Sequence, residues 1–227
     1  MPPRKRRGPG ASAVQRQGDC SVSVTDLDAL FERVYRIVSE PRFLALQGLG
    51  NEVPFFIQPY DVQQQVEVYR RITQLRRRLA ADGNEPLLIS LYDIVLERFT
   101  VRGQLEKLFE RESAIDKQKL KARMEGMLSP EREIAPAVRT LMAGSGARLV
   151  FLYEVGEVFP YLRTHSVLNN LHSVVERVPL VVFFPGSYVS SDRDGFYLSL
   201  FGRFKSDYYR AFHLEEYIER GRIDVDA

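Results

Sequence analysis

Two glutamates follow the short apolar run at residues 149–153 and could take part in chemistry. Glu154 and Glu157 form a close carboxylate pair, and such pairs serve in acid-base catalysis or bind a divalent ion. Carboxylates at this spacing also occur in ordinary turns that water solvates. The pair is therefore a candidate site, with a solvated turn as the alternative.

A second polar group follows a few residues later and includes Arg163, His165 and Asn169. His165 and Asn169 are spaced i, i+4, so on a helix they share one face, and Arg163 precedes the helix N-terminus. An anion held there would be stabilised by the arginine and by free backbone N–H groups. The alternative is that Asn169 and Asn170 cap neighbouring loops and that His165 is an ordinary surface residue.

Other catalytic and metal-binding patterns are missing from the sequence. The single cysteine, Cys20, and the three histidines have no metal-ligand spacing, and there is no Gly-x-Ser-x-Gly motif. The glycine-containing loop from Gly48 precedes its strand, and Asn51-Glu52 stands where a phosphate-binding loop would have lysine. We therefore expect no catalytic residues, no cofactor and no metal, and no Walker A motif.

The candidate residues lie within one strand, helix and strand unit. Residues 149–153 are a buried strand, apolar residues then recur at helical spacing from Val167 to Val178, and residues 180–184 form a second buried strand closed by Pro185-Gly186. This pattern predicts a parallel, right-handed βαβ unit. Its polar residues follow the first strand, at the edge where open α/β sheets bind ligands and partners.

The remaining pattern completes an α/β fold. A helix is expected from near Ser23 or Thr25 until Pro41 terminates it, and its buried face consists of Leu27, Leu30, Phe31, Val34, Ile37 and Val38. Further helices are expected at residues 61–81 and 93–111, the second capped by Asp93 and with Phe109 inward, and a charged, partly exposed helix at 113–128. A strand is expected at residues 86–91, a polar loop at 187–195, a short edge strand at 196–201 and an aromatic segment on the sheet at 208–214. We predict a single three-layer domain with a mostly parallel sheet of four to five strands and helices on both faces.

The helix expected at residues 61–81 is amphipathic. Its predicted buried face consists of Val62, Val66, Tyr69, Ile72, Leu75 and Leu79. The opposite side carries an arginine stripe, which consists of Arg70, Arg71, Arg77 and Arg78. The stripe is either a solvated face or a docking surface for an acidic partner, and the absence of interleaved aromatic residues argues against nucleic acid.

Composition places the chain among ordinary globular domains. Of its 227 residues, 44% are hydrophobic and 27% charged, and no apolar run is long enough to span a membrane. Residues 1–18 hold five basic and no acidic residues, so the net charge of +2 leaves −3 for the rest. We expect a disordered basic tail at 1–22, one domain at 23–220 and a frayed end at 221–227. A lone cysteine and no secretory signal favour a cytoplasmic location.

Several segments together resemble the BrxB family of bacteriophage-exclusion (BREX) defence systems. The matching residues, in the order of the family, are Gly48-Leu-Gly-Asn-Glu-Val-Pro-Phe-Phe-Ile57, Gly156-Glu-Val-Phe-Pro-Tyr-Leu-Arg-Thr-His-Ser-Val-Leu-Asn-Asn-Leu171, Phe184-Pro-Gly-Ser-Tyr188, Leu200-Phe-Gly202 and Tyr208-Tyr-Arg-Ala-Phe212. They span nearly the whole predicted domain. The basic tail lies outside this resemblance.

The resemblance implies a non-catalytic adaptor in a multi-protein apparatus that methylates host DNA and blocks phage replication. Its implied partners are the PglZ-type phosphatase-like component and the large BREX ATPase, with DNA contacted only indirectly through the complex and no membrane. The element order also looks like a P-loop-type core that lacks the phosphate loop. The alternative function is a nucleotide- or phosphate-binding protein with a ligand at residues 156–170.

An adaptor needs anchors, and interface hot spots favour arginine and large aromatic residues. The first candidate partner surface is the edge formed by Phe159, Tyr161, Arg163, His165 and Asn169. The arginine stripe is the second candidate. The edge is favoured because it combines aromatic residues with an arginine, whereas the stripe offers charge alone.

Overall fold

The computed structural model describes residues 27–49, 52–111, 114–191, 195–207 and 211–217. The expected tail at 1–22 and the expected frayed end at 221–227 lie outside the described residues. No helix in the described ranges is long and apolar enough to cross a membrane.

A parallel sheet forms the centre of the molecule. Its strands lie in the order β2 (Leu87–Ser90), β3 (Val150–Tyr153), β4 (Leu180–Ser191), β1 (Phe55–Tyr60) and β7 (Phe212–His213). Every pairing along this path is parallel. Beyond Gly186, β4 pairs antiparallel with β5 (Gly195–Leu200), which pairs with β6 (Phe204–Asp207). The mostly parallel α/β fold is confirmed, and the described sheet has seven strands rather than four to five.

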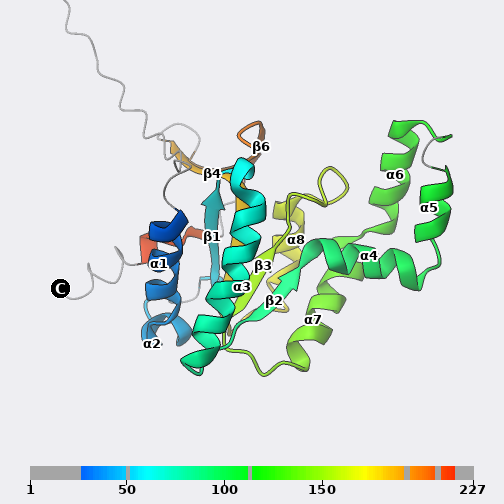
Figure 1. Cartoon of the computed structure of the whole chain (residues 1–227). Helices are drawn as coiled ribbons and strands as arrows, with labels where there is room; N and C mark the ends of the chain where they lie inside the picture. The colour runs from blue at the N-terminus through cyan, green and yellow to red at the C-terminus, as the bar shows by residue number, and fades with distance from the viewer. Residues whose placement is uncertain (1–26, 50–51, 112–113, 192–194, 208–210, 218–227) are drawn as a thin grey trace, which may run out of the picture.

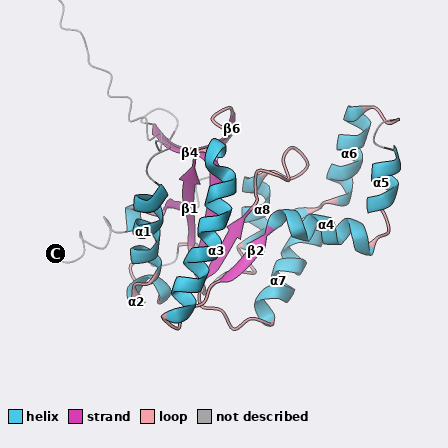
Figure 2. Ribbon diagram, in the orientation of Figure 1, coloured by secondary structure: helices cyan, strands magenta, loops and turns pink. Residues whose placement is uncertain are grey.

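Helices cover both faces of the sheet, as Figures 1 and 2 show. One face packs against α1 (Leu27–Val38), α2 (Pro41–Leu44) and α3 (Gln65–Ala81), and the other against α4 (Leu91–Val101), α7 (Ala135–Ala143) and α8 (Thr164–Leu171). Side chains alternate along β1, so Phe56 enters the first core while Phe55 and Ile57 enter the second. The expected buried face of α1 is confirmed.

The segment after β1 decides whether the core can hold a phosphate. In a P-loop core, the glycine-rich loop follows the first strand. Here β1 is followed by the short 3-10 turn η1 (Val62–Gln64), and Asp61 caps it by accepting a 2.9 Å hydrogen bond from the backbone N–H of Gln63. This segment contains neither glycine nor lysine, so the core has no Walker A motif.

The buried face of α3 differs from the prediction. Val66 is 85% exposed, Val62 lies partly in solvent, and Tyr69 is only partly buried. The residues that pack against the sheet are Val68, Ile72, Leu75 and Leu79. Val66 belongs to α3, but with 3.6 residues per turn it faces away from the side that carries Val68, Ile72 and Leu79. The predicted face followed i, i+3 steps from Val66, and such steps drift around an α-helix.

Three other element predictions are also wrong. Residues 93–111 form two helices, because Gly103 takes a positive φ of 57° after α4 and α5 (Leu105–Arg111) begins anew. The helix α8 ends at Leu171, so Val178 lies in the connection to β4. The expected polar loop at 187–195 belongs largely to β4 and β5, whose residues pair from Gly186 onward. Residues 192–194 lie outside the described part.

The helix α6 (Lys117–Met127) lies beside α5, and together they stand out from the sheet beyond α4 (Figure 1). It is exposed or half-buried throughout, as its charged sequence predicts. A π-helical turn, η2 (Pro130–Ile134), follows, and α7 begins just before Pro136.

Candidate functional site

The carboxyl ends of three parallel strands meet at one edge of the sheet. Tyr60 ends β1, Ser90 ends β2 and Tyr153 ends β3. Glu154 and Glu157 follow β3 directly and lie at the same edge, where they bond to residues of other elements. This is the edge at which α/β proteins bind ligands, so its side chains define the candidate site.

Glu154 is held in an unusual backbone conformation. Its φ is 58°, in the left-handed region that residues with a side chain seldom occupy. The hydroxyl of Ser90 donates a hydrogen bond to Oε2 of Glu154. Partial burial raises the pKa of Glu154, and the nearby carboxylates of Glu157 and Asp93 raise it further, although the Ser90 hydrogen bond opposes them.

Glu157 joins a chain of tyrosine hydroxyls. The hydroxyl of Tyr69, on α3, donates to Oε1 of Glu157, and the hydroxyl oxygens of Tyr60 and Tyr69 lie 3.4 Å apart. Burial raises the pKa of both tyrosines, so both hydroxyls stay protonated at neutral pH. The second oxygen of Glu157, Oε2, is buried without a hydrogen-bond partner among the described residues.

These contacts limit what the edge can do chemically. The acid pair is not simply a solvated turn, because both carboxyl groups bond to side chains from other elements. Two carboxyl groups at the strand ends would repel a phosphate rather than hold one. No group of three or more potential metal ligands is arranged around an ion within the described ranges. Both carboxyl groups at this edge of the sheet therefore bond to the protein's own side chains.

The predicted partner edge lies next to this cluster. Phe159 and Tyr161 are half-buried, and the ring of Phe159 packs 4.7 Å from that of Phe204. Arg163 is the N-cap residue of α8 and is exposed, and its side chain forms no hydrogen bond or ion pair with any described residue. Two half-buried aromatic side chains and an exposed arginine, close to one another in the chain, are thus available at the surface.

The two remaining edge residues lie on α8. His165 is half-buried in the first turn, and Asn169 is exposed one turn later. Asn170 donates a 2.8 Å hydrogen bond from Nδ2 to the carbonyl oxygen of Ser166, within the same helix. It therefore does not cap a neighbouring loop.

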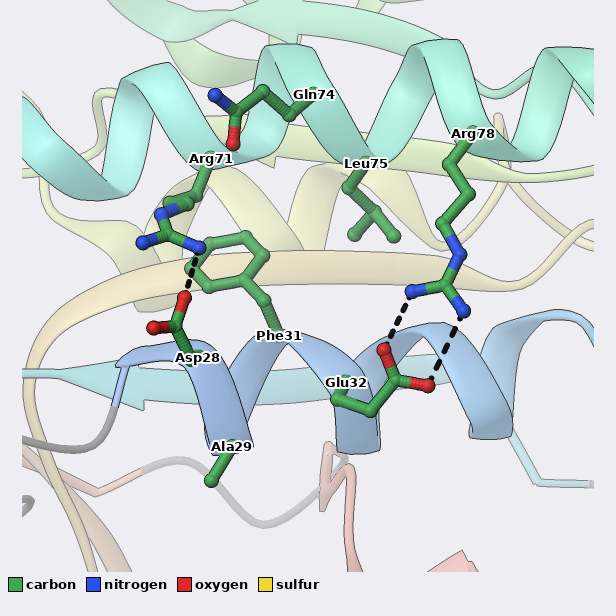
Figure 3. Close-up of a pocket in the computed structure, with 8 residues that line it drawn as sticks. All are labelled: Asp28, Ala29, Phe31, Glu32, Arg71, Gln74, Leu75 and Arg78. Carbon is green, nitrogen blue, oxygen red and sulfur yellow. Dashed lines mark hydrogen bonds and ion pairs between the residues drawn. The ribbon is translucent and has the colours of Figure 1, made fainter.

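Two arginines of the stripe hold α3 against α1 rather than facing solvent alone, as Figure 3 shows. Arg71 pairs with Asp28, and Arg78 pairs with Glu32 through N–O distances of 2.5 and 3.2 Å. The guanidinium of Arg78 also lies 3.4 Å from the ring centre of Tyr35. These pairs span a surface cavity of about 530 Å³ between the two helices.

The other two arginines of the stripe differ from each other. Arg70 forms a two-pronged ion pair with Glu67 on the same helix, which together with Arg71 holds the pKa of Glu67 at about 2. Arg77 is exposed and has no ion pair with any described residue. The stripe is therefore largely a set of internal ion pairs, and Arg77 is the member left available to solvent.

Sequence reasoning missed three residues of the edge cluster. Tyr60 had no predicted role, Tyr69 was assigned to the buried face of its helix, and Ser90 was assigned to the strand at residues 86–91. Ser90 could have been noticed, because a serine just before an apolar helical pattern is a common N-cap, and its Oγ does accept from the N–H of Asp93. Asp93 had been expected to cap that helix instead.

The fold and edge define a class of protein: a three-layer α/β domain with a parallel core that lacks a phosphate loop. Within this class, the chain belongs to the BrxB family, because the family model described as "BREX protein BrxB" matches residues 87–214. BREX is a phage-defence system, and the chain is a component of it.

Two relatives support the same assignment. The BREX protein BrxB of Bacillus cereus (strain H3081.97) is 36% identical over 181 residues, which cover 78% of this chain and 91% of the relative. The BREX protein BrxB of Escherichia coli O9:H4 (strain HS) is 29% identical over 189 residues, covering 83% and 91%. No solved structure matches the chain significantly. The resemblance to the BrxB family is thus confirmed.

Proposed function

We propose that this protein is a non-catalytic adaptor of its BREX system, which docks on the PglZ-type component and on the BREX ATPase. The observation that carries the proposal is the exposed Arg163, which follows the half-buried Phe159 and Tyr161 closely in the chain. Arginine and large aromatic side chains are the residues that most often supply the binding energy of protein interfaces.

The chemistry of the neighbouring strand ends also favours an adaptor. A phosphoryl-transfer site needs backbone donors and cations around the phosphates. Asp61 caps the turn that follows β1, and the carboxyl groups of Glu154 and Glu157 lie at the end of β3. The carboxyl ends of the strands are therefore better suited to a protein partner nearby than to the phosphates of a nucleotide.

Binding of the PglZ-type protein to two matched arginine variants tests the proposal. Arg163→Ala should weaken binding by about 1–2 kcal/mol, because it removes the cationic anchor of the partner edge. Arg77→Ala is the control, since Arg77 is also exposed and forms no ion pair with a described residue, but lies on α3. Calorimetric titration of the parent and both variants gives the comparison.

The exposure of Arg163 makes this test interpretable, because removing an exposed side chain without an internal partner should leave the melting temperature near that of the parent. Equal affinities for the parent and Arg163→Ala would reject the edge as the docking surface. The absence of any complex with either BREX protein would reject the adaptor function itself.

A further inference from the structure

The segment from residue 101 to residue 127, here called the arm, has an unfinished core. It contains α5, of seven residues, and α6, of eleven. Helices this short are not stable alone in water and depend on tertiary packing. Yet no described residue of the arm is buried, and Phe109 is 67% exposed. The arm therefore presents apolar surface that its own fold leaves partly uncovered.

An apolar groove runs between the arm and the sheet domain. Phe99 of α4, Leu108 of α5 and Leu120 of α6 line it. Tyr161 of the partner edge and the one acidic lining residue, Glu157, also border it. Its volume of about 210 Å³ is below the usual range for small-molecule sites, roughly 300–1,000 Å³. The groove is therefore suited to a few apolar side chains of a partner rather than to a cofactor.

The charges beside the groove select among partners. On α6, basic residues flank the groove residues Leu120 and Met124 on both sides at helical spacing, and these are Lys117, Lys119, Lys121 and Arg123. The only acid on α6 is Glu125, which lies 3.5 Å from Lys121. Lys117 and Lys119 form no ion pair with any described residue. The α6 wall is thus a basic flank beside an apolar floor.

We propose that the arm groove binds an amphipathic helix of a partner protein, with apolar anchors in the groove and acidic residues along α6. The opposite wall, α5, mixes acidic and basic exposed residues, Glu106, Lys107 and Glu110, so α6 is the wall that offers a basic flank to an acidic partner. The inference rests on the proposed adaptor function, because it states the chemistry of the partner. Tyr161 makes the groove continuous with the edge that holds Arg163.

A designed peptide is the direct probe. A labelled peptide of about 18 residues is long enough to be helical, with leucines along one face and glutamates elsewhere. Fluorescence anisotropy should show that the full-length protein binds it. A peptide with lysines in place of the glutamates, and one with alanines in place of the leucines, should bind at least about fivefold more weakly.

Surface variants of the protein then locate the binding. Phe109→Ala should weaken peptide binding at least about fivefold, whereas Leu141→Ala, which removes an exposed apolar side chain from α7, should not. Lys117→Glu with Lys119→Glu should weaken binding most at low salt, since the attraction is screened as ionic strength rises. Both lysines and Phe109 are exposed, so these variants should fold.

Each outcome is decisive for the groove. If the acidic peptide does not bind, or binds equally well to Phe109→Ala, the inference is wrong. If sedimentation shows a dimer of the parent that Phe109→Ala dissociates, the occupant is a second copy of this chain and the proposed partner is wrong. A complex with the PglZ-type protein that forms without peptide binding would reject the groove alone, whereas peptide binding without any BREX complex would reject the adaptor function alone.

Discussion

Glu154 combines two features that are costly at a single residue. Its positive φ of 58° is strained for a residue with a side chain, and its carboxyl group is partly removed from water beside two other carboxylates. Such combinations cluster at functional positions, because the surrounding structure must stabilise them. Here the hydroxyl of Ser90 supplies a hydrogen bond to the carboxyl group.

The raised pKa of Glu154 leads to a prediction about pH. The folded protein binds this proton more tightly than the unfolded chain does, so the free energy of unfolding should fall as pH rises from 4.5, the ordinary value, through the raised pKa. Glu154→Gln removes the titration while keeping an acceptor for Ser90. Its melting temperature relative to the parent should therefore be higher at about pH 8 than at about pH 4. If the melting temperatures of Glu154→Gln and the parent differ by the same amount at both pH values, the pKa of Glu154 is not raised in the folded protein.

A second prediction concerns Gly186, where β4 passes from its parallel to its antiparallel pairing. A Cβ atom at this position would lie 2.1 Å from the backbone oxygen of Ser199, on the paired strand β5. Gly186→Ala should thus lower the free energy of unfolding by about 3 kcal/mol or more, as measured by urea denaturation.

The matched control is Gly144→Ala, at the end of α7. Gly144 has an ordinary negative φ, and an added Cβ atom would meet nothing closer than 3.9 Å. This alanine should raise the free energy of unfolding by about 0.4–1 kcal/mol, because it restricts the unfolded chain without strain in the folded one. Equal effects of the two substitutions would show that backbone crowding at Gly186 is unimportant.

At the scale of elements, the ion pairs between α1 and α3 explain why the arginine stripe is a poor docking candidate. Arg71 and Arg78 already have carboxylate partners on α1, and a partner protein would have to replace those contacts. Partly exposed pairs of this kind contribute little stability, so the apolar core that α1 and α3 share holds the two helices together. Sequence periodicity placed the arginines together but could not reveal what faces them.

The arm gives the element-scale prediction. Because none of its described residues is buried, its helices should open locally without unfolding the sheet. Amide hydrogen exchange should show protection at least about 100-fold lower in α5 and α6 than in β1 and β4, which lie in the centre of the sheet. Equal protection would mean that the arm belongs to the main cooperative unit.

At the scale of the whole molecule, the strand order places β1 beside β4 and joins it to the distant β2 through α3. This crossover carries Tyr69 across the carboxyl edge to Glu157, 88 residues away in the chain. The same arrangement lets α4 begin at the edge and lead outward into the arm (Figure 2). The edge and the arm groove are thus two parts of one continuous surface.

The whole-molecule prediction concerns nucleotides. Neither ATP nor GTP with Mg²⁺ should raise the melting temperature, because a ligand stabilises the native state only if it binds there, and the turn after β1 offers no phosphate cradle. Thermal unfolding with and without millimolar nucleotide measures this. A rise of more than about 4 °C would instead support the nucleotide-binding alternative.

The sequence by itself determined the α/β class, the buried strands, the family and the lack of a Walker A motif. These properties depend on residue type and local spacing, which a single chain displays directly. Its local patterns failed where a residue was assigned to the wrong face of a helix, as at Val66, and where a polar-looking strand found a partner, as after Gly186. There, pairing and packing with distant segments outweigh local preference.

Only the tertiary structure decided which side chains meet. Ser90 bonds to Glu154 across 64 residues and Tyr69 to Glu157 across 88, and neither pair is visible in any local pattern. Likewise, the exposure of Phe109 depends on how α5 lies against α4 and α6, although its spacing alone predicts an inward side chain. Strand order, register and helix crossings bring remote residues together, and those are properties of the assembled chain rather than of any segment within it.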